Sequence, residues 1–190
     1  MSSTDIRSMS FKLAWRDEAD GVKYNTLASI TLLIDGTPAW PIPGEDTSEF
    51  EWFADELFAH LAECWKPLVL RQTYPIPVQP ERPSLLRSEA EKRWSALTGP
   101  AAEKEEQEVA AFEDVHNLAN AFGGVTGLLP LWFLRNHDDM IVDTQERLWK
   151  VPFDVARSAL TIAGSAIADR LGKADHDKWA QLLTAWQQRA

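Results

Sequence analysis

Apolar residues take every second position in two early stretches, over 11–15 and again over 28–34. This period-two alternation predicts two half-buried β-strands. Asp35-Gly36 then predicts a tight turn into a short third strand over 37–40, which Pro41 ends because proline cannot donate to a strand ladder. The first forty residues are therefore expected to form an antiparallel meander.

Apolar positions three to four residues apart predict helices in much of the remaining chain. The first is expected over 48–65, where Ser48 and Glu51 have the spacing of a capping box. The helix expected over 152–171 is apolar on most sides, which predicts that it is packed on most sides. Asp175 should cap a last amphipathic helix. The remaining helices are expected over 84–97 and 101–122.

A second strand pair is expected at 129–134 and 140–144, joined by a polar turn at 135–139, with a third short strand over 147–151. Four prolines predict an extended strap over 74–83 that lies across the core. The small polar residues 1–10 are expected to be flexible. The chain thus predicts one α+β domain over 11–190, in which a small antiparallel sheet from 11–41 and 129–151 is packed by about five helices.

Charge and cysteine content narrow the classes of partner and compartment. The formal charge is −10, from 19 basic and 29 acidic side chains, which argues against broad binding of nucleic acid or anionic membranes. The single cysteine, Cys64, favours a reducing compartment. No apolar run is long enough to span a bilayer, and the first ten residues have no apolar core of a signal peptide. A cytoplasmic protein is expected.

Catalytic chemistry has weak support in the sequence. Glu113 and His116 have Glu-x-x-His spacing, but a di-metal site needs a second such copy plus two further glutamates, and no second copy exists in the chain. Neither HExxH nor a CxxC pair occurs. We therefore predict no catalytic residue, no cofactor and no metal site. If the chain were a metal-dependent enzyme, its polar site would have to combine Glu113, His116, His137 and Asp139 in one cleft.

Two surfaces are candidates for binding a partner. The segment 45–63 carries seven carboxylates and no lysine or arginine, and the turn at 135–139 is polar. Trp40 and Trp52 do not fit an apolar stripe, which makes them candidates for a contact surface. A solvated acidic face and an ordinary polar turn are the simpler alternatives. The predicted binding surface comprises Glu49, Trp52, Glu56, Arg135, His137, Asp138 and Asp139.

The stretch 66–104 carries seven basic and four acidic residues, in contrast to the rest of the chain. Four of the basic residues could form one positive face for an acidic partner or a nucleic-acid backbone. The alternative is that they are solvated, or that they pair with the nearby glutamates. These four residues are Arg82, Arg87, Arg93 and Lys104.

Two segments carry a family resemblance: LAECWKPLVLRQTYPIPVQPERPSLL at 61–86, and FEDVHNLANAFGGVTGLLPLWFLRNHDDMIVDT at 112–144. Together they resemble the region that precedes the peptidase domain in some ImmA/IrrE-like bacterial proteins. The HExxH of that peptidase is absent here, so the resemblance implies the accessory part and carries over no catalytic residue. His116, Trp132 and the turn at 135–139 correspond to the resembling segment without an assigned role.

These observations favour a non-catalytic recognition or interaction module of a cytoplasmic bacterial protein. It would act in cis or in trans with an effector such as a metallopeptidase, so its partner would be another protein or an adjacent domain. A small metal-dependent enzyme with an unrecognised site is the first alternative. A nucleic-acid-binding accessory protein is the second, and the acidic composition disfavours it.

Overall fold

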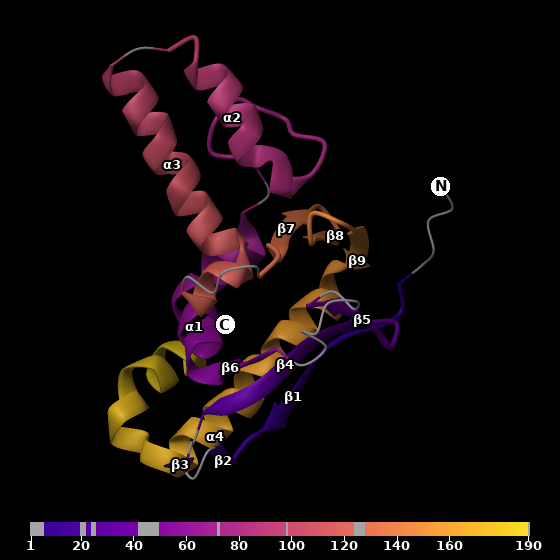
Figure 1. Ribbon diagram of the computed structural model, residues 1–190, viewed down its shortest axis with the longest axis vertical. Helices are drawn as coiled ribbons and strands as arrows, with labels where there is room; N and C mark the ends of the chain where they lie inside the picture. Colours follow the sequence, from indigo (N-terminus) through magenta and orange to yellow (C-terminus); the bar gives the residue numbers. More distant parts are fainter. Residues whose placement is uncertain are drawn as a thin grey trace.

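The computed structural model describes residues 6–19, 22–23, 26–41, 50–71, 73–97, 99–123 and 128–189, of which 18–19 and 22–23 are described by their backbone only. It contains helices and antiparallel sheets, so the predicted α+β class is confirmed. The prediction of a single sheet from 11–41 and 129–151 is wrong. These two stretches form separate sheets, and both sheets contribute side chains to the same main hydrophobic core, together with α1 and α4 (Figure 1).

The first sheet is built around one central strand, β4 (Leu27–Ile34). One edge of β4 pairs with β1 (Met9–Trp15), and the other pairs with both β5 (Thr37–Trp40) and β6 (Glu51–Phe53). The backbones of β2 (Glu18–Ala19) and β3 (Val22–Lys23) form a separate two-stranded ribbon. The predicted meander is thus present, with an additional strand on the same edge as β5.

The alternation in β4 directs Ala28, Ile30 and Leu32 into the core, where all three are fully buried. Asp35 and Gly36 form the predicted turn with positive φ angles of 48° and 75°. The Oδ1 atom of Asp35 accepts hydrogen bonds from the backbone N–H groups of Arg7 and Ser8, each at 2.9 Å. Because β1 begins at the buried residue Met9, residues 9 and 10 of the segment expected to be flexible belong to the first sheet, whereas residues 1–5 lie outside the described ranges.

The first helix, α1, spans Ala54–Leu70 and does not begin at 48 as predicted. Glu51 lies in β6, opposite Ser29 of β4, and Ser48 lies outside the described residues. The edge of β4 provides backbone partners that a helix would lose: the N–H of Ile30 donates to the carbonyl of Phe50 at 2.8 Å. The helix also continues beyond 65, through Pro67.

The C-terminal helix, α4, spans Phe153–Gln187 and folds back on itself at Asp175, whose backbone angles (φ −161°, ψ 87°) are not helical. The Oδ1 atom of Asp175 accepts from the N–H of Lys178 at 3.1 Å, so this residue caps the second segment as predicted. One side of α4 packs on α1 and β1. The opposite side faces solvent, as the 66% exposure of Ile162 shows. The prediction that this helix is packed on most sides is therefore wrong on that side. In the described part of the chain, no helix is long and apolar enough to cross a membrane.

The second sheet consists of β7 (Trp132–Asn136), β8 (Asp139–Asp143) and β9 (Leu148–Pro152), in that order. Its two faces belong to two different clusters of buried residues. Phe133 and Val142 face the main core between the first sheet, α1 and α4. Leu134 and Ile141, one position along each strand, face a smaller second cluster on the other side.

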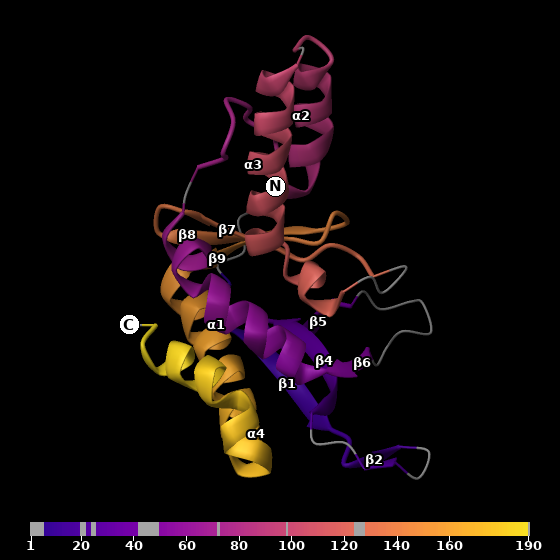
Figure 2. The ribbon, with the colours of Figure 1, turned by 90° about the vertical axis from the view of Figure 1, so that its left-hand side faces the viewer.

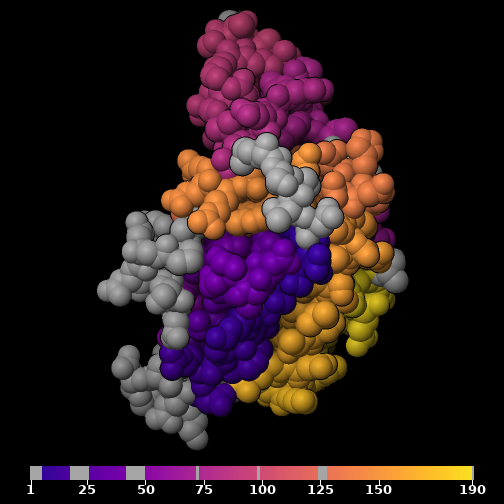
Figure 3. All heavy atoms as spheres, turned by 90° about the vertical axis from the view of Figure 1, so that its right-hand side faces the viewer, coloured from indigo at the N-terminus to yellow at the C-terminus, as the bar shows by residue number. Residues whose placement is uncertain are grey.

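The second cluster is covered by the strap and by an arm of two helices. The arm comprises α2 (Leu86–Trp94), preceded by a short 3-10 helix (Pro83–Leu85), and α3 (Pro100–His116). The two helices run side by side away from the body, and in Figure 3 they stand above the second sheet (Figures 1 and 2). The helix expected over 101–122 therefore ends at His116, and a separate 3-10 helix (Leu118–Phe122) follows it.

Candidate functional site

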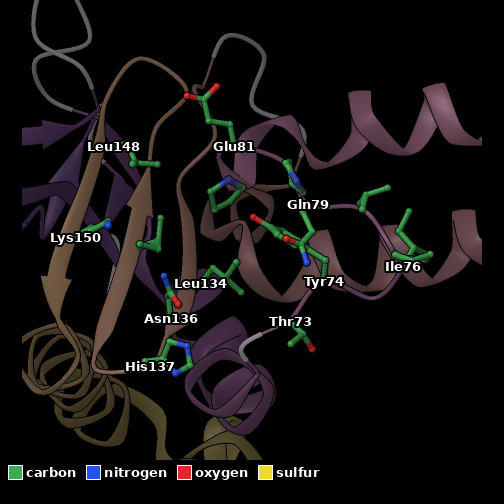
Figure 4. A pocket seen from close by; sticks show the side chains of 15 residues that line it. Thr73, Tyr74, Ile76, Gln79, Glu81, Leu134, Asn136, His137, Leu148 and Lys150 are labelled. Atoms are coloured by element: carbon green, nitrogen blue, oxygen red, sulfur yellow. The ribbon is translucent and has the colours of Figure 1, made fainter. Parts of the chain in front are cut away.

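A cavity of about 720 Å³ lies between the strap and the outer face of the second sheet (Figure 4). We call it the strap cavity. Its lining mixes apolar side chains with hydroxyl, amide, imidazole, carboxylate and ammonium groups. These residues are Thr73, Tyr74, Ile76, Pro77, Val78, Gln79, Pro80, Glu81, Pro83, Leu134, Asn136, His137, Ile141, Leu148 and Lys150.

Strand alternation explains which sheet residues reach the strap cavity. Leu134 and Asn136 are two apart on β7, and Leu148 and Lys150 are two apart on β9, so each pair projects from one face. The strand β9 is the last in its sheet, and in the described part of the chain no strand pairs with its outer edge. Leu148 is 43% exposed there. The cavity therefore adjoins an edge strand that carries an exposed apolar side chain.

The strap is fastened to the sheet by Asp143, whose side chain is fully buried. Its carboxylate accepts from Nε of Arg82 at 3.0 Å and from the backbone N–H of Ser84 at 2.8 Å and of Gln145 at 2.9 Å. Burial raises the pKa of Asp143, but these hydrogen bonds outweigh that effect and hold the pKa below its ordinary value. The sequence analysis did not identify this residue. An aspartate that ends an apolar strand, with an arginine at the end of the strap, was the available signal.

Tyr74 contributes a phenol to the strap cavity. Burial, assisted by the charge of Asp143, raises its pKa to about 12. The hydroxyl is therefore protonated throughout the neutral range and can donate a hydrogen bond to a ligand.

The predicted binding residues of the hairpin tip separate onto different faces. His137, with a φ of 55°, occupies the turn and lines the strap cavity. Arg135 lies on the opposite face of β7, where its guanidinium stacks 4.0 Å from the ring centroid of Phe153. Asp138 is exposed in the turn and Asp139 pairs with Asn136 at the start of β8. The tip is thus not one continuous surface.

The other predicted binding surface, the acidic segment, is only partly described. Glu49 lies outside the described residues. Trp52 is half-buried against the main core, and its Nε1 donates to Oε2 of Glu56 at 2.5 Å. The indole N–H of Trp52 is therefore already hydrogen-bonded to Glu56.

Trp40 was a candidate for a contact surface, and the structure contradicts this. Its side chain is fully buried in the main core, with Nε1 donating to the carbonyl of Leu129 at 2.9 Å. The indole stacks on Phe122 with a centroid distance of 5.8 Å. The strand β5 ends at Trp40 and directs it inward, whereas the sequence alone showed no stripe to which it belonged.

His116 is fully buried and its Nδ1–H lies 2.7 Å from the carbonyl oxygen of Phe133, to which it donates. Burial lowers its pKa to about 4, against the opposing effect of that hydrogen bond, so the imidazole is neutral at pH 7. Among the described residues, Nε2 of His116 has no hydrogen-bond partner. Glu113, one turn earlier on α3, instead accepts from Nε of Arg87 at 2.8 Å.

The polar site required for a metal-dependent enzyme is therefore not assembled. Within the described ranges, no group of three or more histidine, cysteine, aspartate or glutamate side chains could hold a metal ion. Glu113 and His116 are each engaged by other groups on or beside α3, and His137 lies in the hairpin turn.

The predicted basic face is neutralised by acidic partners. Arg82 pairs with Asp143 and Arg87 pairs with Glu113. The other two pairs are Arg93–Glu105, at 2.7 Å, and Lys104–Glu108, at 3.8 Å. Three of these four pairs join different elements: Arg82–Asp143 links the strap to β8, and the pairs of Arg87 and Arg93 link α2 to α3.

Cys64 of α1 is half-buried, and burial together with the charge of Glu63 raises the pKa of its thiol. A protonated thiol is a poor nucleophile, so we interpret Cys64 as a packing residue.

The features available for function are thus the strap cavity, the edge of β9 and the uneven distribution of charge. Comparison of the chain with known protein families, with curated proteins and with solved structures found no match.

Proposed function

We propose that the chain is a non-catalytic recognition module that binds an extended segment of another protein or of an adjacent domain. The segment lies along the outer edge of β9, and alternate side chains enter the strap cavity. The observation that carries this proposal is the cavity of about 720 Å³ beside β9, whose outer edge pairs with no strand in the part of the chain that the structure describes.

The geometry matches a recurring mode of peptide recognition, in which a strand adds to a sheet edge. Main-chain hydrogen bonds to the edge supply affinity, and pockets for every second side chain supply specificity. Leu148 and Lys150 project from β9 onto the face that bears the cavity. An added strand would place every second side chain over that same face.

We further propose that the module belongs to a cytoplasmic bacterial protein and acts in cis or in trans with an effector such as a metallopeptidase. The support is the resemblance of segments 61–86 and 112–144 to the accessory region of ImmA/IrrE-like proteins. These two segments contain all the residues lining the strap cavity except Leu148 and Lys150.

Site-specific photo-crosslinking in the native host tests the proposal. A photoreactive amino acid is placed at Leu148 in one variant and at Ile162 in the other. Both residues are apolar and exposed, Leu148 to 43% and Ile162 to 66%, but Ile162 lies on α4. We expect a discrete protein adduct at Leu148 and none at Ile162. The same adduct at both positions, or none at Leu148, would contradict the proposal.

A further inference from the structure

A second, smaller recess of about 200 Å³ lies where the end of α1 meets the start of α4. Arg135 enters it from β7, and the period-two alternation of that strand places it on the face opposite to the strap cavity. We call it the basic recess. Its lining residues are Trp65, Lys66, Val69, Leu70, Arg135, Phe153, Arg157 and Arg189.

Four of these side chains are cationic, and none of the lining residues is acidic. The four are Lys66, Arg135, Arg157 and Arg189. Among the described residues, none of them forms an ion pair, although the arginines of the strap and arm all do. Asp154, the nearest carboxylate along α4, is exposed and pairs with none of them in the described part of the chain. A chain of net charge −10 therefore brings together, around one recess, four positive charges that form no ion pair with any described residue.

Two of the four cationic groups, Arg135 and Arg189, are held by aromatic rings and backbone carbonyls, which leave some of their N–H donors free. Arg135 uses Nε for the carbonyl of His137 and one terminal nitrogen for that of Val69, at 3.1 and 3.3 Å. Arg189 donates to the carbonyl of Trp186 at 2.5 Å and stacks 3.9 Å from its ring centroid. A guanidinium carries five N–H donors, so both arginines retain unused ones.

The cations also repel one another. The pKa of Arg189 is lowered, first by its burial and then by the nearby charge of Arg157. Like charges gathered at a partly desolvated site oppose folding unless an anion compensates them. A bound oxyanion would relieve this repulsion and would accept hydrogen bonds from the free guanidinium donors.

We propose that the basic recess binds carboxylate side chains of an acidic protein segment that also carries an apolar residue. The apolar part of the lining argues for a peptide. Leu70 is 61% exposed beside the charges, and a small inorganic anion would leave it uncovered. The guanidinium of arginine can bind a carboxylate through two parallel hydrogen bonds. This site lies apart from the strap cavity and does not depend on the function proposed for it.

The test measures binding of the capped peptide Glu-Glu-Leu-Glu-Glu by isothermal titration calorimetry at low salt. The test variant, Lys66→Gln with Arg157→Gln, removes two exposed charges of the recess. The control, Lys12→Gln with Lys178→Gln, removes two exposed charges elsewhere on the surface. We expect saturable binding to the native chain, weakened by roughly tenfold or more in the test variant and unchanged in the control.

Two outcomes would overturn the proposal. One is the absence of peptide binding; if inorganic phosphate then binds with a dependence on Lys66 and Arg157, the recess is a site for a small anion instead. The other is equal weakening in the test and control variants, which would indicate a general charge effect. A peptide in which glutamine replaces every glutamate should not bind, and circular dichroism establishes that each variant is folded.

Discussion

Gly164 and the indole of Trp186 are in such close contact that no side chain fits between them. A Cβ atom at Gly164 would lie 2.4 Å from both Cη2 and Cζ2 of Trp186. Trp186 is itself fixed in the main core, with its ring centroid 5.7 Å from Phe58 and 5.3 Å from Trp65. This contact closes the two segments of α4 onto α1.

Gly164→Ala should therefore destabilise the protein. Overpacking a filled core costs about 1–3 kcal/mol, and the better helix propensity of alanine recovers at most about 1 kcal/mol. Gly172→Ala is the matched control on the same helix, because its Cβ would lie 3.9 Å from Leu183, an ordinary contact. Urea unfolding should show a lower midpoint for Gly164→Ala and an unchanged or higher one for Gly172→Ala. Equal stability of the two variants would show that Trp186 moves aside freely.

Asp143→Asn should loosen the strap. The substitution leaves Arg82 without its anion, and because Arg82 is 23% exposed we expect a loss of roughly 2–4 kcal/mol, below that of a fully buried pair. Glu89→Gln removes one partner of the exposed Lys92–Glu89 pair and should cost less than about 0.5 kcal/mol.

The effect of Asp143 should also depend on pH. Its pKa is lower in the folded state than the ordinary value of 3.8, so its stabilising contribution is complete above that value and is lost as the pH falls through the folded pKa. Urea unfolding of the native chain and of Asp143→Asn should converge in acid. A constant difference between them down to pH about 2 would show that the Asp143 charge does not stabilise the fold.

Local signals in the sequence were sufficient for most elements. The turn at Asp35-Gly36, the cap at Asp175 and the alternation of β4 each depend on neighbouring residues, and the structure contains all three. The predicted start of α1 was wrong because it depends on a contact with a distant part of the chain. Glu51–Phe53 pairs with β4, more than twenty residues earlier, and this competing partner cannot be read from a local helical spacing.

The candidate site was harder to predict because it depends on contacts between distant segments. Asp143 meets Arg82 across 61 residues, and the basic recess joins residues from α1, β7 and both ends of α4. The predicted turn at 135–139 was too long, because only His137 and Asp138 form the turn, whereas Arg135 and Asn136 belong to β7 and Asp139 begins β8. The faces to which Arg135 and His137 point depend on the register of β7, and the sequence placed that strand at 129–134 instead of Trp132–Asn136.

Duplex DNA should not bind to the arm. Arg82, Arg87 and Arg93 are each in an ion pair, so binding would have to break existing pairs before it released counterions from the DNA. Fluorescence anisotropy with labelled DNA at about 0.1 M salt should show no saturable binding, since no broad positive footprint is available. Affinity that falls steeply with added salt would instead support a nucleic-acid-binding function.

Purified protein should contain no stoichiometric metal. Glu113 accepts from Arg87, His116 donates to Phe133, and no metal-binding group of three is present within the described ranges. Elemental analysis after purification without chelators should therefore find each of zinc, iron and manganese well below one equivalent. A full equivalent that is lost in a His116→Gln or His137→Gln variant would favour the metal-dependent enzyme.

His116 should make the fold sensitive to mild acid. Its pKa is about 4 in the folded state and 6.5 ordinarily. Between these two pH values the unfolded chain binds a proton at His116 that the folded chain does not bind. Between pH 7 and 5 this linkage removes about 2 kcal/mol of unfolding free energy. His60 has a pKa lowered mainly by burial, so it acts in the same direction and requires its own variant.

The measurement that isolates His116 is urea unfolding at pH 7, 6 and 5 for the native chain, His116→Gln and His60→Gln. Glutamine retains a donor for the carbonyl of Phe133 but cannot be protonated, so His116→Gln should lower stability at pH 7 and flatten its dependence on pH. His60→Gln should retain most of the slope, because its imidazole is only half-buried and reaches the carbonyl of Val115 at 3.0 Å. If His116→Gln kept the full dependence of stability on pH, protonation of the buried imidazole could not cause that dependence. In that case Nε2 of His116, which has no partner among the described residues, would have to be accessible to water.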